Sequence, residues 1–513
     1  SNTVVINTDD ADGGTTTFAY DKNGNQTKQT DALGNVVTIA YDSMGRVISQ
    51  GSKEAGTVTF TYDAAGNLTV MTDGAGNTAT SEYDVLGRQV RYTDSTGNVL
   101  EKSYDLLGNV TETRYADGGA ERAVYDALGN VTARTDVLGA TFAYRYDAKG
   151  RMLSETDGDG RVWSYAYDNN GNLLSVTNPE GGVVASAYDA ANRQVSVTDE
   201  EGRTAAYEYD GAGRVTKVTN GDGSTQTMKY DANGNLVEGV DGNGNISRYT
   251  YNSTNEINSV TDPNGNLTAL QYDALGNLEK TVDSLKGETH YAYDSRGNVL
   301  EMTDALGRKY AYAYDKTGNH VKTTYPTGDV LSMEYDGEGR LLKVTDVQGL
   351  SVEYTYDGLG RTLGAKDSEG HATAWTYDAA GNVTSQTDGL GRVTSYAYDN
   401  YGRLLQVTEA DGSVTSYEYD VMDRLAAVTD AEGRRTAFAY DKAGNLVSMS
   451  EADGAVWQYA YDQINRLVSQ TDPLGGTLVY AYDGNGNLVK HTDENGVASS
   501  YTYDGNDNLT GVT

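Results

Sequence analysis

The side chains best suited to chemistry in this chain are 74 Asp and Glu residues and four histidines, since carboxylates and imidazoles can serve as general acids, bases or metal ligands. Many of the carboxylates follow a strict period. Twenty-four tyrosines lie 21 residues apart, from Tyr20 to Tyr503, and each is followed by Asp, except that Asn252 follows Tyr251. A catalytic pair made from these residues would have to exist in every copy. The sequence therefore predicts a structural role for the carboxylates and no enzyme activity.

The histidines do not form a constellation. Counted from the tyrosine of each repeat as position 0, they lie at positions −3, +6, +15 and +9, which are His290, His320, His371 and His491. No two histidines share a position and none recurs, so neutral sequence variation at surface positions is favoured over a metal site or a catalytic triad. Calcium is the sharper alternative for Asp-rich turns, but the Gly-Gly-x-Gly-x-Asp spacing of calcium-binding nonapeptides is absent. We predict no catalytic, cofactor-binding or metal-binding residues.

The net charge of −35 invites a reading as a cation-binding or basic-partner-binding protein, but the repeat accounts for most of it. Asp occupies position +1 in 23 copies, and it occurs 17 times in the register of position +11 when Asp10, ahead of the first full copy, is counted. This leaves 34 of the 74 acidic residues against 39 Lys and Arg. The negative field repels phosphates, so nucleic acid is an unfavourable partner. No cysteine is present, which excludes disulfides and thiolate metal sites.

Each repeat contains two Asp-x-x-Gly units, which predict two tight turns. Asp can accept a hydrogen bond from a backbone N–H two residues on, and Gly supplies the positive φ that such a turn needs. At position +4, the five residues that replace Gly are all Asn or Asp, which tolerate that conformation best. They are Asn192, Asn255, Asp423, Asn465 and Asp507. At position +14 the exceptions are Ala55 and Lys286, and each is followed directly by a glycine.

All four prolines, Pro179, Pro263, Pro326 and Pro473, lie at position +12, where a turn already requires the φ that proline imposes. The segments between turns, such as 67–72 and 77–83, are six or seven residues long and rich in Val, Leu, Thr and Tyr. They are too short for helices and predict strands. We therefore expect an all-β fold of tandem antiparallel hairpins, one array over residues 1–513, in a continuous coiled sheet that forms a spiral, hollow shell or tube.

Strand alternation places positions −4, −2 and 0 on one face. Position −2 is aromatic in 16 of 24 copies, so aromatic rows are expected to run along the sheet as a core ladder, with sugar binding as the alternative. Five tyrosines lie outside these rows: Tyr92, Tyr115, Tyr310, Tyr325 and Tyr401. Tyr115 and Tyr325 replace the Asp of a second turn. As exposed turn aromatics they could contact a partner, although neutral drift is favoured and no site is assigned.

The repeat resembles the YD-repeat or Rhs family, whose signature is Tyr-Asp-x-x-Gly-[Asn/Arg]-[Leu/Val] with a downstream Thr-Asp. Residues 62–68 with Thr72 and Asp73 match in full, as do residues 377–383 with Thr387 and Asp388. The family includes bacterial polymorphic toxin carriers, wall-associated proteins and the animal teneurins. The resemblance implies a large hollow β-shell that encloses a toxic C-terminal segment or serves as an extracellular scaffold, secreted or at the bacterial cell surface.

Two features depart from that pattern. Carriers in the family end in a core rich in Asp-Pro-x-Gly, whereas here only 262–265 and 472–475 fit, both in ordinary turn positions. The repeat length is also constant, which favours an open tube or stalk as well as a closed shell. Because both ends of the sequence fall within the repeat pattern, we expect a fragment of a longer protein.

The leading hypothesis is a non-enzymatic scaffold that encloses or displays a toxin or effector segment of the same polypeptide. The alternative is an extracellular adhesin, filament or stalk that recognises cell-surface glycans or proteins. Neither cofactor nor membrane insertion is expected. Flanking segments would discriminate the two: a variable C-terminal domain indicates toxin delivery, and a wall anchor or lectin domain indicates adhesion.

Overall fold

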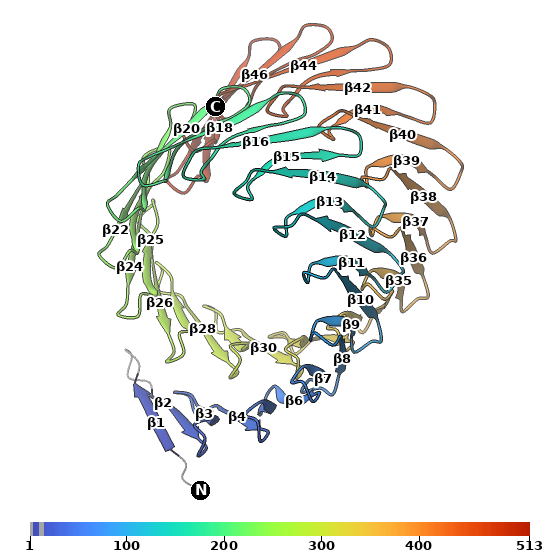
Figure 1. Cartoon of the computed structure of the whole chain (residues 1–513). Coiled ribbons are helices and arrows are strands. Elements are labelled where there is room, and N and C mark those ends of the chain that lie inside the picture. Colours follow the sequence, from blue (N-terminus) through green and yellow to red (C-terminus); the bar gives the residue numbers. More distant parts are fainter. Residues whose placement is uncertain (1–3, 10–14) are drawn as a thin grey trace. The chain divides into compact units, whose positions relative to one another are not determined.

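The computed structural model describes residues 4–9 and 15–513. Those residues form 49 β-strands, and no helix long and apolar enough to cross a membrane is found among them. Figure 1 shows the strands coloured along the chain. The all-β fold of tandem antiparallel hairpins is therefore confirmed.

Every even-numbered strand from β2 onward ends on a repeat tyrosine. These strands are β2 Thr15–Tyr20, β4 Val36–Tyr41, β6 Gly56–Tyr62, β8 Thr78–Tyr83, β10 Val99–Tyr104, β12 Ala120–Tyr125, β14 Thr141–Tyr146, β16 Val162–Tyr167, β18 Val183–Tyr188, β20 Thr204–Tyr209, β22 Thr225–Tyr230, β24 Ile246–Tyr251, β26 Leu267–Tyr272, β28 Glu288–Tyr293, β30 Lys309–Tyr314, β32 Val330–Tyr335, β34 Ser351–Tyr356, β36 Ala372–Tyr377, β38 Val393–Tyr398, β40 Val414–Tyr419, β42 Arg435–Tyr440, β44 Val456–Tyr461, β46 Thr477–Tyr482 and β48 Ala498–Tyr503.

The odd-numbered strands from β3 onward follow the first turn of a repeat, and β1 precedes β2. They are β1 Val4–Asp9, β3 Gln26–Thr30, β5 Val47–Ser52, β7 Leu68–Thr72, β9 Gln89–Thr93, β11 Val110–Arg114, β13 Val131–Thr135, β15 Met152–Asp157, β17 Leu173–Thr177, β19 Gln194–Thr198, β21 Val215–Thr219, β23 Leu236–Val240, β25 Ile257–Thr261, β27 Leu278–Val282, β29 Val299–Thr303, β31 His320–Thr324, β33 Leu341–Thr345, β35 Thr362–Asp367, β37 Val383–Thr387, β39 Leu404–Thr408, β41 Leu425–Thr429, β43 Leu446–Ser450, β45 Leu467–Thr471, β47 Leu488–Thr492 and β49 Leu509–Val512.

The two turns of a repeat close different hairpins. We call positions +1 to +5 the first turn and positions +11 to +15 the second turn. Across the first turn, β6 pairs with β7 and the register shifts by one residue between Thr61 and Tyr62. Across the second turn, β7 pairs with β8 without a shift. A bulge beside the first turn adds local twist to each repeat.

The glycine assignments in both turns are confirmed by backbone geometry. Asn192, Asn255, Asp423, Asn465 and Asp507 all have φ between 61° and 65°. The two exceptions at position +14 behave differently from each other. Gly56 takes φ of 70° after Ala55, whereas Lys286 itself adopts φ of 69° and its following glycine does not take over the role.

The aromatic face is only half-buried. In β8 the residues at positions −4, −2 and 0 are half-buried and those between them are exposed, as alternation predicts. However, Ala140 and Ala427 are the only fully buried apolar residues in the described part of the chain, and no large side chain there is fully buried. Each strand is covered by its neighbours in the ladder, not by a second packed layer. The aromatic rows expected as a core ladder are therefore only half-buried.

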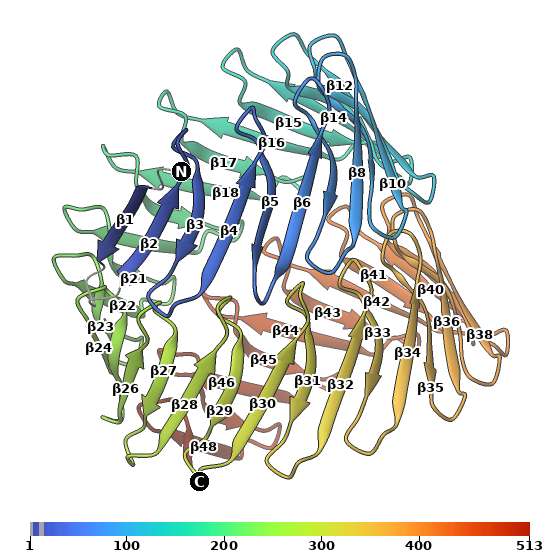
Figure 2. The same cartoon turned by 90° about the horizontal axis from the view of Figure 1, so that it is seen from below.

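The chain divides into two compact units, each assembled from separate segments. Unit 1 comprises Ser1–Arg122, Tyr251–Ser259 and Leu267–Val393, and unit 2 comprises Ala123–Thr250, Val260–Asn266 and Thr394–Thr513. Within unit 1, Figure 2 shows the row β2 to β10 next to the row β27 to β35, with hairpin ends meeting between them. Residues more than 240 positions apart are thus brought together inside one unit.

Candidate functional site: the seam between distant repeats

The Asp of each first turn is occupied in holding that turn. In the Tyr62 repeat, Asp63 Oδ1 accepts the backbone N–H of Asn67 at 2.9 Å, and Oδ2 accepts the Asn67 side-chain amide at 2.9 Å. In the Tyr83 repeat, Arg88 replaces that Asn and donates Nε to Asp84 Oδ2 at 2.7 Å. Asn or Arg, both of which can donate to this carboxylate, occupies position +5 in every copy except that of Tyr251, where Glu256 accepts from the Asn252 amide.

These hydrogen bonds favour the ionised carboxylate. The side chain and then the backbone N–H of Asn67 lower the pKa of Asp63 below its ordinary value. The backbone N–H of Arg88, followed by its guanidinium, does the same to the pKa of Asp84. A lowered pKa suits a charged turn acceptor and not a general acid, which agrees with the structural role predicted for the repeated carboxylates.

The repeat tyrosine has a polar role that the sequence did not reveal. The Tyr62 hydroxyl donates to the Val47 carbonyl at 2.9 Å, and the Tyr83 hydroxyl donates to the Leu68 carbonyl at 2.8 Å. The same bond spans 15 residues in many other repeats, for example from Tyr503 to Leu488 at 3.0 Å. Phenylalanine cannot make this bond, so the hydroxyl gives a reason for Tyr at position 0 in the repeats that form it.

The arginine at position +5 also connects neighbouring repeats. The Arg46 guanidinium lies 4.7 Å from the centre of the Tyr62 ring, and Arg88 lies 4.7 Å from that of Tyr104. Arg88 Nη1 also donates to the Asp105 carbonyl at 2.9 Å. Each such arginine therefore fixes its own turn and covers the tyrosine of the next repeat.

Longer-range contacts join second turns to first turns in unit 1. Ser295 donates to Glu54 at 2.8 Å, although their repeats begin at Tyr293 and Tyr41, 252 residues or twelve periods apart. The backbone N–H of Ser95 likewise donates to Glu338 at 2.9 Å. We call this row of second-turn to first-turn contacts the seam.

The seam in unit 2 has the same twelve-repeat offset. Arg424 at position +5 donates to Glu180 at position +13 at 2.7 Å, and Arg466 donates to Asp222 at 3.1 Å. Where the side chains are amides, Asn485 donates to Asp241 at 2.8 Å. The offset requires a constant repeat length, because an inserted residue would shift every later turn out of register.

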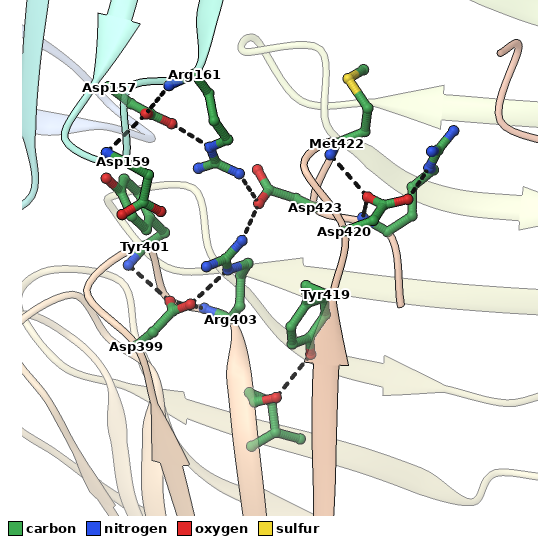
Figure 3. A network of polar contacts seen from close by, with 12 residues as sticks. Asp157, Asp159, Arg161, Asp399, Tyr401, Arg403, Tyr419, Asp420, Met422 and Asp423 are labelled. Carbon is green, nitrogen blue, oxygen red and sulfur yellow. Dashed lines mark hydrogen bonds and ion pairs between the residues drawn. The ribbon is translucent and has the colours of Figure 1, made fainter. Parts of the chain in front are cut away.

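The most buried ionic network of the seam lies in unit 2 (Figure 3). Arg161 Nε donates to Asp157 at 2.5 Å and Nη1 bonds Asp423, while Arg403 donates to the same Asp423 at 2.5 Å. The Asp157 side chain is 2% exposed and that of Arg161 is 10% exposed. Burial disfavours the charged guanidinium of Arg161, but hydrogen bonds to Asp423 and Asp157 outweigh it and raise its pKa.

Tyr401 completes this network. Its ring lies 4.9 Å from the Arg161 guanidinium, 5.4 Å from that of Arg403, and edge-on to Phe142 at 6.3 Å. Tyr401 is one of the five tyrosines outside the repeated rows, and here it is a seam residue. Only the contact from a repeat twelve periods away distinguishes it, so no local sequence signal could have assigned this role.

The other unusual tyrosines are half-buried, so the expectation of exposed turn aromatics is wrong for Tyr115 and Tyr325. Tyr325 packs edge-on against Tyr310 at 6.3 Å. Tyr115 bonds Glu121 at 3.2 Å and, with Tyr92, lines a cavity of about 350 Å³ at the seam of unit 1. Further lining residues include Asp94, Leu100, Glu338, Arg340 and Leu359.

The histidines remain scattered. His371 bonds Asp367 in its own turn at 2.9 Å, His320 lies 3.0 Å from Thr323, His290 contacts Glu288 at 3.1 Å, and His491 stacks on Tyr480. Within residues 4–9 and 15–513, no group of three or more His, Asp or Glu has a metal-binding arrangement. The polar contacts described above close turns within a repeat or join the turns of distant repeats.

Tandem hairpins, turns closed by an Asp side chain, and a seam between repeats twelve periods apart define a β-hairpin repeat protein of the YD type. The RHS Repeat model matches residues 5–36, 20–53, 41–78, 83–120, 125–162, 146–183, 188–225, 230–267, 259–289 and 482–513, together more than half of the chain. The Teneurin YD-shell model matches residues 279–369 and 329–461. The chain belongs to the RHS-repeat family.

Solved structures share the fold at low sequence identity. A mutant Tc holotoxin pore of Photorhabdus luminescens has a TM-score of 0.65 and 15% identity, covering 92% of this chain and 36% of that one. The crystal structure of TcdB2-TccC3-TEV gives 0.64 and 16%, covering 97% and 30%. TcdB2-TccC3 without its hypervariable C-terminal region gives 0.63 and 15%, covering 91% and 36%. This chain thus spans about a third of their length. No curated protein matches it in sequence.

Proposed function

We propose that residues 1–513 form one array of about 24 repeats that acts as a non-enzymatic scaffold, the wall of a secreted or cell-surface bacterial protein. In this proposal the wall encloses or displays a toxin or effector segment of the same polypeptide. The scaffold role itself is consistent with the RHS-repeat family and with the Tc toxin structures that share the fold.

The observation that carries the proposal is the seam. A single-layer sheet has little buried apolar surface, so lateral joining of its edges is what would make it a stiff barrier. Both units have that joining at the same offset, through Arg361 to Asp117 at 3.3 Å in unit 1 and Arg424 to Glu180 at 2.7 Å in unit 2. A wall needs such uniform contacts, whereas an active site would need one copy to differ.

Protease protection tests enclosure. A flexible, protease-sensitive polypeptide is attached after Thr513, and its digestion is followed by mass spectrometry. Enclosure predicts that it is cut at least tenfold more slowly than the same polypeptide attached to an unrelated soluble protein. A variant with Gly484→Ala, which opens the seam, should lose the protection. Equal digestion rates in all three proteins would rule out enclosure.

A second candidate function is glycan recognition by an adhesin, and the unit 1 cavity favours it. Tyr92 and Tyr115 offer aromatic surface beside the carboxylates of Asp94 and Glu338, a combination suited to stacking and hydrogen bonding with a sugar ring. A glycan array with the purified chain tests this function. Binding that disappears in Tyr115→Asp, which restores the usual turn residue, would support it, and binding that is indifferent to Tyr92→Ala and Tyr115→Asp would exclude this cavity.

A further inference from the structure

Each unit has two edges that the seam leaves outside. In unit 1, the outer first-turn edge consists of the first turns of the repeats from Tyr20 to Tyr104. The outer second-turn edge consists of the second turns of the repeats from Tyr272 to Tyr377. Apolar side chains stand out on the first of these edges: Met44 is 71% exposed, Val85 102%, Leu86 71%, Leu106 102% and Leu107 73%.

The opposite edge of unit 1 also carries exposed apolar side chains. Leu285 is 89% exposed, Leu306 78%, Val347 45% and Leu350 50%. Turn tips of a solvated sheet are ordinarily polar, so two rows of this kind indicate contact surfaces.

The seam itself shows what such edges bind. It places the second turn of one repeat against the first turn of the repeat twelve later. In a chain of 24 repeats, the same offset carried into a second copy would set the sixteenth repeat of one molecule against the fourth of the next. Val347 and Leu350 would then face Val85 and Leu86. By the same rule, Leu306 would face Met44.

The charges of unit 2 follow the same register. In its seam, a carboxylate at position +13 pairs with an arginine at position +5, as in Glu180 with Arg424 and Asp222 with Arg466. On the outer edges, Asp411 and Asp453 occupy position +13 of the Tyr398 and Tyr440 repeats. The offset sets them opposite Arg151 and Arg193, at position +5 of the Tyr146 and Tyr188 repeats.

We propose that the outer second-turn edge docks on the outer first-turn edge of a second copy of this chain, with the twelve-repeat offset of the seam. The interface continues the contacts already made within each unit, and its register sets the apolar pairs and the opposite charges named above against each other. Leu106 and Leu107 would face the polar turn 367–371 instead. It goes beyond the proposed scaffold role, because it makes the wall extendable by added copies. Since the two surfaces differ, the interface is heterologous and leaves a binding edge at each end of every assembly.

The test uses two dead-end variants of the full chain. One carries Val85→Glu and Leu86→Glu on the first-turn edge, and the other carries Val347→Glu and Leu350→Glu on the second-turn edge. All four positions are exposed turn residues, and circular dichroism checks that each variant folds. Masses are measured by sedimentation velocity over a hundredfold range of concentration.

The proposal predicts open-ended oligomers of the unaltered chain that grow with concentration, and monomers for each variant alone. An equimolar mixture of the two variants should give dimers and nothing larger, because each supplies the edge the other lacks. Monomeric unaltered chain at all concentrations would overturn the proposal and assign the edges to another occupant, such as a further segment of a longer chain. Dimers formed by either variant alone would overturn it in favour of a symmetric contact.

Discussion

The seam and the outer edges contain the same turn in two environments. Arginine occupies position +15 in both. In the seam the side chains of Arg161 and Arg203 are 10% and 12% exposed, whereas on the outer second-turn edge those of Arg308, Arg392 and Arg434 are 56%, 67% and 68% exposed. Each pairs with the Asp four residues before it. The conformation of each turn is therefore determined by the residues of its own repeat. The burial of its side chains is determined by whether a repeat twelve periods away packs against it.

Leucine at position +3 shows the same difference in unit 1. Leu359 in the seam is 39% exposed, against 71% for Leu86 and 73% for Leu107 on the outer edge. The seam thus removes about a third of a leucine side chain from water, which contributes about 0.5–1 kcal/mol per position. Repetition of small terms, and not a single large core, stabilises this fold. Matched substitutions at the same repeat position can separate the two environments.

The largest difference is expected for the arginine at position +15. Arg161→Met should lower the free energy of unfolding by about 3 kcal/mol, because it leaves the nearly buried Asp157 carboxylate with backbone N–H donors but without its positively charged partner. Arg434→Met removes an ion pair of the same geometry on the outer edge of unit 2 and should cost much less, because solvent screens the exposed pair. Urea unfolding followed by circular dichroism measures both. Equal losses would show that the seam is not formed in solution.

A smaller difference is expected for glycine at position +2. An added Cβ on Gly484 would lie far inside contact distance of the Gly242 carbonyl across the seam, whereas nothing lies within 4 Å of the same atom on Gly211. Gly484→Ala should therefore destabilise the protein by about 1–3 kcal/mol through overpacking. Gly211→Ala should stabilise it by up to about 1 kcal/mol by restricting the unfolded chain. Thermal unfolding checks the opposite signs, and a stabilising Gly484→Ala would contradict the close backbone approach.

Sequence reasoning succeeded where a turn is determined by its own residues. Asp, Gly and Pro at fixed positions predicted both turns, and the Asn and Asp replacements at position +4 predicted the positive φ values that are found. It failed where geometry accumulates over many repeats. The seam offset depends on the small rotation of each hairpin relative to the next, which no single residue specifies. From the sequence, Tyr401 is therefore interpreted as a neutral variation. The structure shows that its ring contacts Arg161, in a repeat twelve periods away.

Tyr401 itself provides the next comparison. Tyr401→Ala removes the ring that contacts Arg161 and Phe142, and should cost about 1–2 kcal/mol from lost cation–π and edge-to-face contacts. Leu128 occupies the same position +3 on the outer first-turn edge of unit 2 and is 73% exposed. Leu128→Ala should change stability by less than about 0.5 kcal/mol. Urea midpoints of the two variants test the contrast, which would fail if both substitutions were neutral.

The smallest effect concerns His371, which occupies position +15 on the outer edge of unit 1, where Arg161 stands in the seam of unit 2. The hydrogen bond from Nδ1 to Asp367, at 2.9 Å, and the charge of that carboxylate raise the pKa of His371 above its ordinary value. Because the folded pKa is raised, the bond's stabilisation is fully present below the unfolded pKa and is lost as the pH rises through the folded pKa. Titration of the His371 ring by NMR should show a lower pKa in Asp367→Asn and no change in Asp388→Asn, one repeat further along the same edge. An unaltered pKa in Asp367→Asn would mean that the hydrogen bond between positions +11 and +15 forms only in turns that the seam covers.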